Sequence, residues 1–158
     1  MSGGRRVDCV ANIARLPGDV FEYVTTPGHW PQWHPSSIRV TGATDHSLLA
    51  GEECTEEYVV AGRHGVCVWN VLERDAPRKW TITASPAEGG SATITYTLSP
   101  AGDGTRFLRS MTYAMPNWFF ALLDGLFLKK RIQAESEEAV ARLKATLENL
   151  SVFAERPR

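Results

Sequence analysis

Alternating apolar and hydroxyl side chains recur along the middle of the chain and leave few folds open. Six segments are rich in β-branched and aromatic residues: 38–44, 52–61, 66–73, 79–85, 92–99 and 105–115. The clusters between them contain Gly, Asp and Pro, which accept positive φ or preset a turn. The pattern predicts six strands, each pairing antiparallel with its neighbour in the sequence.

One face of this sheet has to be covered by another element. Ile94, Tyr96 and Leu98 alternate with threonines, so their strand has one apolar and one hydroxyl face. Further along the chain, apolar residues recur three and four positions apart, at positions 128, 132, 139, 140, 143, 147 and 150. This spacing predicts one long amphipathic helix. We expect it to open at Pro116 and to kink or break at Gly125.

The segment before these strands is predicted to contain one further strand and two short helices. Residues 7–14 mix small and β-branched side chains and lead into a Leu-Pro-Gly break. Pro17 suits the first position of a helix and precedes an apolar stripe. Residues 29–34 lie between two prolines, so the second helix has room for only a turn or two.

Composition and motifs exclude several functions. The 17 basic and 18 acidic residues give a net charge of −1, whereas nucleic-acid binders normally carry a basic excess. The longest apolar stretch, residues 118–128, falls short of the roughly 20 residues of a membrane span. Histidines and cysteines lack zinc-site spacing, and no nucleotide-binding or hydrolase motif occurs. We therefore expect no nucleic-acid partner, no metal and no cofactor.

Length and cysteine usage indicate one reduced domain. A chain of 158 residues with 43% hydrophobic residues supports a single core, which we expect over about residues 7–150. Three cysteines cannot all pair within one chain, so a disulfide framework is not expected. Residues 1–15 lack the apolar run of a secretory signal, which favours a cytoplasmic location.

This order of elements resembles the START-like (SRPBCC) superfamily, which includes polyketide cyclases/dehydrases and lipid-transport domains. The resemblance spans residues 7 to about 150, and its most telling part is the run LPGDVFEYVTTPGHWPQWHP at residues 16–35. Weaker matches lie at Gly51 and at residues 69–73, 78–80 and 104–107. The resemblance implies an α+β helix-grip fold, with a seven-stranded curved antiparallel sheet, two short helices after the first strand and one long C-terminal helix.

The resemblance also implies a pocket between the curved sheet and the long helix. Such sites are mostly apolar, with a few polar groups that orient the ligand. Alternate residues of the last strand, from Phe107 through Arg109 to Met115, share one face, and we expect this face with the larger side chains to point inward. An inward Arg109 needs a partner, and Glu56 and Tyr58 are the candidates. The planar guanidinium group of Arg109 is suited to binding a carboxylate or an enolate. Periodicity alone leaves open an outward Arg109 or one that ties two strands together.

The candidate ligand-binding residues share an expected position at this pocket. They are Trp33, Tyr58, Trp69, Tyr96, Phe107, Arg109, Met111, Tyr113, Met115, Trp118 and Phe119. Most large apolar side chains belong to the core, and the adaptable Met111 and Met115 are the best candidates for lining a cavity. Trp118 and Phe119 head an apolar front that suits a lid closing on the Trp33 helix, a dimer contact or a membrane-touching edge.

Three functions remain open. The favoured one is binding of a hydrophobic small molecule, such as a lipid, an isoprenoid or an aromatic, polyketide-like metabolite. The second is a cyclase/dehydratase-like enzyme in which Arg109 stabilises an enolate, Tyr113 or Tyr58 donates a proton and Glu56 acts as base. The third is a protein-interaction domain with a vestigial pocket, and a homodimer is open in each case.

Overall fold

The computed structural model describes residues 5–60, 62–86, 89–115 and 125–154. Strands and helices follow the predicted order, and the two short helices after the first strand are present, with a 3-10 turn between them. The elements are β1 (Arg5–Ile13), α1 (Pro17–Val24), η1 (Pro27–His29), α2 (Trp30–Trp33), β2 (Ser37–Gly42), β3 (Glu53–Val60), β4 (Arg63–Asp75), β5 (Lys79–Ala84), β6 (Ser91–Ala101), β7 (Gly104–Ala114) and α4 (Gly125–Ala154).

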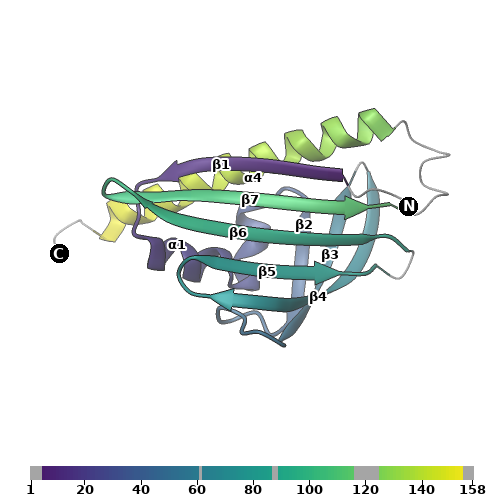
Figure 1. Cartoon of the computed structure of the whole chain (residues 1–158), viewed down its shortest axis with the longest axis horizontal. Helices are drawn as coiled ribbons and strands as arrows, with labels where there is room; N and C mark the ends of the chain where they lie inside the picture. The colour runs from purple at the N-terminus through teal and green to yellow at the C-terminus, as the bar shows by residue number, and fades with distance from the viewer. Residues whose placement is uncertain (1–4, 61, 87–88, 116–124, 155–158) are drawn as a thin grey trace.

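The seven strands form one antiparallel sheet in the order β1-β7-β6-β5-β4-β3-β2. Strands β2 to β7 are a meander, and β1 pairs with β7, so the first strand joins the last. Register shifts interrupt the β2–β3 and β4–β5 pairs, and irregularities of this kind bend a sheet. Figure 1 shows the sheet curving, with β2 and β3 turned across the other strands. The α+β helix-grip fold is confirmed.

The inward face of the sheet carries the predicted apolar side chains. On β5 and β6 the buried residues Trp80, Ile82, Ile94 and Tyr96 all point to the same side of the sheet. The alternating threonines point to the outer side, where Thr81 and Thr95 hydrogen-bond to each other across the two strands. The period of two therefore predicted correctly which face of these strands is covered.

Helix α4 covers the sheet unevenly. It packs mainly against β1 and against α2, and Figure 1 shows it running along the β1 side of the sheet. Its predicted stripe is buried from Leu128 to Leu147, whereas Leu150 in the final turns is 45% exposed. The expected helix start at Pro116 lies outside the described residues. None of the helices within the described ranges is long and apolar enough to span a membrane.

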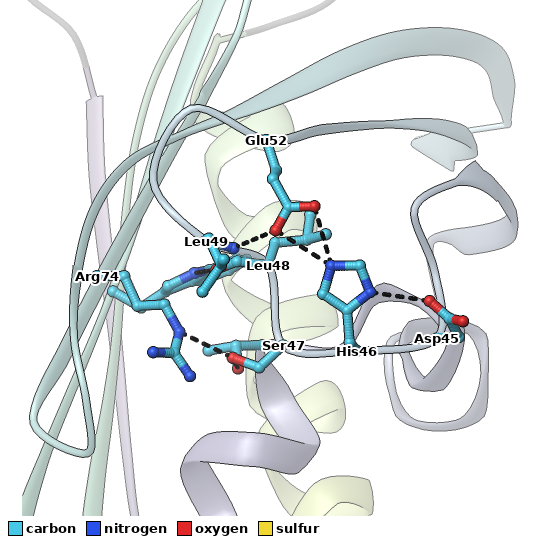
Figure 2. Close-up of polar contacts among 9 residues, drawn as sticks. Asp45, His46, Ser47, Leu48, Leu49, Glu52 and Arg74 are labelled. Atoms are coloured by element: carbon cyan, nitrogen blue, oxygen red, sulfur yellow. Dashed lines mark hydrogen bonds and ion pairs between the residues drawn. The ribbon is translucent and has the colours of Figure 1, made fainter.

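The loop between β2 and β3 is held by a histidine between two carboxylates (Figure 2). The His46 Nδ1 atom lies 2.8 Å from Asp45 Oδ1, and its Nε2 atom lies 2.9 Å from Glu52 Oε2. Glu52 also accepts a hydrogen bond from the Leu49 amide at 2.8 Å. The loop carries the buried Leu48, whose carbonyl accepts a hydrogen bond from the Trp80 indole.

Candidate functional site

A cavity of about 180 Å³ lies between the sheet and α4 and is partly open to solvent. Its walls come from α2, from strands β3 to β7 and from α4. Two features leave this space unfilled. Because α4 rests on β1 and α2, it stands away from the middle strands. In addition, Ala84 of β5 and Ala92 of β6 lie directly opposite each other, and both line the cavity with single methyl groups.

Most of the predicted ligand-binding residues lie at this cavity. Its walls include Trp33, Tyr58, Trp69, Tyr96, Arg109, Met111, Tyr113 and Met115. Phe107 does not line the cavity, because it is fully buried and the Tyr96 ring lies against it at a centroid distance of 5.2 Å. Trp118 and Phe119 lie outside the described residues.

Aromatic packing fills the part of the interior next to the cavity. The Tyr96 ring stacks on Trp80 at 5.5 Å and lies 6.3 Å from Trp33, while Trp80 meets Trp30 edge-on at 6.2 Å. Aromatic pairs at these separations attract each other beyond their area burial. Tyr96 therefore separates the buried rings of Trp80 and Phe107, which do not line the cavity, from the open space.

Arg109 points inward and is only 3% exposed. Its Nη1 atom donates to Ser136 Oγ at 3.1 Å, and its Nη2 atom lies 3.3 Å from His34 Nε2. A third hydrogen bond joins Arg109 to the hydroxyl of Tyr96, the residue opposite it on β6. Burial raises the pKa of Tyr96 to about 12, which keeps this hydroxyl neutral. Of the three groups named here from the described residues, two are therefore uncharged hydroxyls.

His34 was missed as a site residue because the sequence favours a surface or turn histidine between two prolines. In the structure it lies at the cavity wall beside Arg109. Burial, and then the positive charge of Arg109, hold the pKa of His34 well below its ordinary value, so the ring is neutral. Its Nδ1 atom faces the Ser36 amide at 3.2 Å while its Nε2 atom faces Arg109. The third contact of Arg109 is thus uncharged as well.

Glu56 lines the cavity from β3, on the strand where the sequence predicted it. Its Oε1 atom accepts a hydrogen bond from the Trp69 indole at 3.1 Å. Burial raises the pKa of Glu56, and its contacts with Ser37 and Trp69 and the charge of Arg109 oppose that shift only in part. Among the described residues Glu56 forms no ion pair with Arg109 within 4.0 Å, so the expected direct contact between them is not made.

Helix α4 contributes polar groups that sequence reasoning also missed. Ser136 is buried and contacts Arg109, and Glu135 accepts a hydrogen bond from Ser36 Oγ at 2.7 Å. A signal for Ser136 was present in the sequence. It lies four residues from both Ile132 and Val140, so it is a hydroxyl within the apolar stripe of the helix.

Three residues that line the cavity each have one buried polar atom with no hydrogen-bond partner within the part of the chain that the structure describes. These atoms are Trp33 Nε1, Arg109 Nε and the Tyr113 hydroxyl. Buried polar groups are nearly always hydrogen-bonded in folded proteins, and one left alone costs about 1–3 kcal/mol. Three of them around one cavity therefore favour an occupant with polar atoms.

Tyr58 takes its place at the cavity because the residue opposite it is a glycine. Tyr58 of β3 pairs with Gly65 of β4, and a Cβ atom built on Gly65 comes within 2.5 Å of the tyrosine ring. The ring thus lies over the bare backbone of β4. Any side chain at position 65 requires Tyr58 to move at the cavity wall.

Solved structures share this fold. The di-domain ARO/CYC StfQ from the steffimycin biosynthetic pathway superposes with a TM-score of 0.74 at 14% identity, over 95% of this chain and 53% of that chain. TTHA0849 from Thermus thermophilus gives 0.71 at 18% identity, over 93% and 99% of the two chains. DynU16, a protein in the dynemicin biosynthetic locus, gives 0.62 at 17% identity, over 90% and 47%.

At these identities the superpositions show a shared fold, and StfQ and DynU16 are each about twice as long as the matching part. No curated protein matches the chain. A family model does match, over residues 5–148, which is nearly the whole sequence. The chain therefore belongs to the family described as polyketide cyclase / dehydrase and lipid transport.

Proposed function

We propose that this protein binds a hydrophobic small molecule, of the lipid, isoprenoid or aromatic polyketide-like class, in the cavity between the sheet and α4. The observation that carries the proposal is the lining of this cavity. Its walls are mainly apolar and aromatic, and they include a small set of buried polar atoms without partners in the described ranges. That combination is typical of ligand sites, where apolar walls supply affinity and a few polar groups set orientation.

The volume of the cavity supports a compact guest. An engineered apolar cavity of about 150 Å³ binds benzene, and the cavity here measures about 180 Å³. Met111 and Met115 line the wall on β7 and just beyond it, and their unbranched side chains adapt to guests of different shape. We therefore expect a ligand with one or two rings, or a short chain, to fit without rearrangement of the backbone.

The test is binding of a neutral two-ring dye, 1-aminonaphthalene, whose fluorescence shifts to shorter wavelength in an apolar site. Ala92→Phe places a ring in the cavity, while Thr97→Phe places the same ring on the exposed outer face of the same strand. We expect saturable binding to the wild type and to Thr97→Phe, and a loss of at least about tenfold in affinity with Ala92→Phe. Equal binding by both variants, or none by the wild type, contradicts the proposal.

A second candidate is a cyclase-like enzyme acting in the same cavity. The observation that favours it is that Arg109, Tyr113, Tyr58 and Glu56 all line this one space. Burial raises the pKa of Glu56, which makes its carboxylate a stronger base once ionised. Glu56 would take a proton next to a ketone, and Arg109 would stabilise the resulting enolate. The enolate carbon would then bond to a second carbonyl carbon of the same molecule, whose C=O π bond breaks, and a tyrosine hydroxyl would protonate the alkoxide oxygen formed there.

The enzyme candidate is tested with an aromatic polyketide precursor and Tyr113→Phe, which removes only a hydroxyl that has no partner among the residues the structure describes. If the protein is an enzyme, we expect Tyr113→Phe to lower turnover by about 10²-fold or more and to change the affinity for the dye little. Unchanged turnover would mean that Tyr113 takes no part in the reaction.

The protein-interaction alternative predicts instead that capture of a partner survives Ala92→Phe. A homodimer and a cytoplasmic location stay predictions.

A further inference from the structure

The guanidinium of Arg109 forms no ion pair with a carboxylate among the described residues. Two carboxylates line the same cavity, Glu56 and Glu135, and neither forms an ion pair with Arg109 within 4.0 Å in the described ranges. Glu135 is engaged elsewhere, by Ser36 at 2.7 Å and by Arg131 at 3.3 Å. The Glu56 carboxyl is held by the Trp69 indole. A buried charge without a counter-charge is costly, so this arrangement is incomplete in the free protein.

Two N–H donors on side chains beside this cavity have no acceptor among the described residues. Arg109 Nε and Trp33 Nε1 are both buried N–H groups without partners in the described part of the chain. Both side chains adjoin Tyr96, since Trp33 lies against its ring and Arg109 bonds to its hydroxyl. The two unused N–H groups are therefore carried by side chains that contact the same tyrosine.

His34 leaves one further donor without a full acceptor. Its two ring nitrogens face two donors, the Ser36 amide and the Arg109 guanidinium. A neutral imidazole has only one acceptor nitrogen, so one of these two donors is also left without a full hydrogen bond. The group that completes the site is one that accepts hydrogen bonds and donates none. An ionised carboxylate has this property, because both of its oxygens only accept.

We propose that the ligand of this cavity is an amphipathic carboxylic acid, whose carboxylate binds Arg109 and the Trp33 indole while its apolar body extends along Met111 toward Ala92. This inference rests on the proposed binding function and narrows its ligand class. A single guanidinium matches one negative charge, and its planar N–H groups match the two oxygens of a carboxylate. A neutral alcohol of the same shape leaves the positive charge uncompensated and brings one more donor.

The test compares matched ligands on the full-length chain by isothermal titration calorimetry at pH 7.5. Naphthoic acid and naphthalenemethanol, substituted at the same ring position, share one apolar body and differ in the acid group. Decanoic acid and decanol form a second pair with a flexible body. We expect each acid to bind about tenfold to a hundredfold more tightly than its alcohol, the range for hydrogen bonds to a charged group.

Two variants assign the preference to Arg109. Arg109→Met keeps a long side chain and removes the charge, and we expect the acid and alcohol of each pair to bind it with equal affinity. Arg106→Gln removes one positive charge from the exposed face of the same strand and should keep the full acid preference. If Arg109→Met fails to fold, the ratio measured on the wild type still decides between acid and alcohol.

The outcomes separate this inference from the proposed function. Equal affinity of acid and alcohol for the wild type overturns the acid assignment and leaves a hydrophobic binding site in place. An acid preference that survives in Arg109→Met also overturns it. If neither member of either pair binds, and the neutral dye does not bind, the binding function itself is wrong. An acid preference that disappears in Arg109→Met and persists in Arg106→Gln supports the assignment.

Discussion

The carboxyl group of Glu56 opposes folding when it is ionised. Burial raises its pKa in the folded protein, with only partial opposition from neighbouring hydrogen bonds and from Arg109. Between its unfolded pKa, about 4.3, and its higher folded pKa, the folded state binds more protons than the unfolded state. The stability that comes from this stronger proton binding is complete below the unfolded pKa and is lost as the pH rises through the folded pKa.

We therefore predict that Glu56→Gln melts at a higher temperature than the wild type at pH 7.5. The difference should shrink toward pH 4, because the wild-type carboxyl group is then protonated and resembles the amide. Thermal unfolding followed by circular dichroism across this pH range measures it, with the exposed Glu53→Gln as control. A lower melting temperature for Glu56→Gln at pH 7.5 would show instead that the ionised carboxylate stabilises the fold.

At the scale of elements, the loop between β2 and β3 depends on the charge of His46. Hydrogen bonds to Asp45, and then to Glu52, raise the pKa of His46, and the pKa values of both carboxyl groups are lowered. A raised histidine pKa gives stability that is fully present below about pH 6.5 and is lost as the pH rises through the folded pKa. The carboxylates require a pH above their own pKa, so the cluster in Figure 2 is strongest near pH 5.5.

We predict that His46→Gln lowers the melting temperature more at pH 5.5 than at pH 8.5. The measurement is thermal unfolding of both proteins at the two pH values in low salt, because salt screens exposed ion pairs. His64→Gln is the control, since His64 is exposed and forms no ion pair within the described ranges. If His46→Gln lowers the melting temperature equally at both pH values, the His46 ring acts by its shape and not by its charge.

The docking of α4 on β1 is the second element that can be tested. Leu143 is fully buried in the apolar stripe of α4, whereas Leu150 near the end of the same helix is largely exposed. We predict that Leu143→Ala lowers the free energy of unfolding by about 2–5 kcal/mol, and that Leu150→Ala changes it by less than about 0.5 kcal/mol. Urea unfolding measures both changes in the free energy of unfolding. Similar changes for the two variants would mean that Leu143 does not belong to the buried stripe of α4.

For the whole molecule, the uneven seating of α4 leaves a cavity, and the proposed function places a ligand in it. A ligand that binds only the folded state adds about 2.7 kcal/mol at a hundredfold excess over Kd. For a chain of this size we predict a rise in melting temperature of about 5–10 °C with a saturating naphthoate. Ala92→Phe should show no such rise. A shift of equal size in both proteins would locate binding outside the cavity.

The arrangement of strands and helices could be predicted because it depends on local patterns. A period of two determines which residues share a strand face, so Arg109 and Tyr113 were expected on one face of the last strand, and in the structure both are buried on that face. The position of Pro17 and apolar spacings of three and four predicted the helix that starts at Pro17 and the buried stripe of α4. Ser136 within that stripe was a local signal too, although a hydroxyl at one position does not reveal its partner.

What the tertiary structure alone decided was which inward residues pack and which border a space. Phe107 and Met111 share one face of β7, yet Phe107 is sealed under Tyr96 while Met111 lines the cavity. The partners of Arg109 come from His34, which is 75 residues away, and from α4. Side-chain periodicity fixes direction from local backbone geometry, but a void depends on the distance between layers. That distance was set by the seating of α4 on β1, through contacts between residues far apart in the chain.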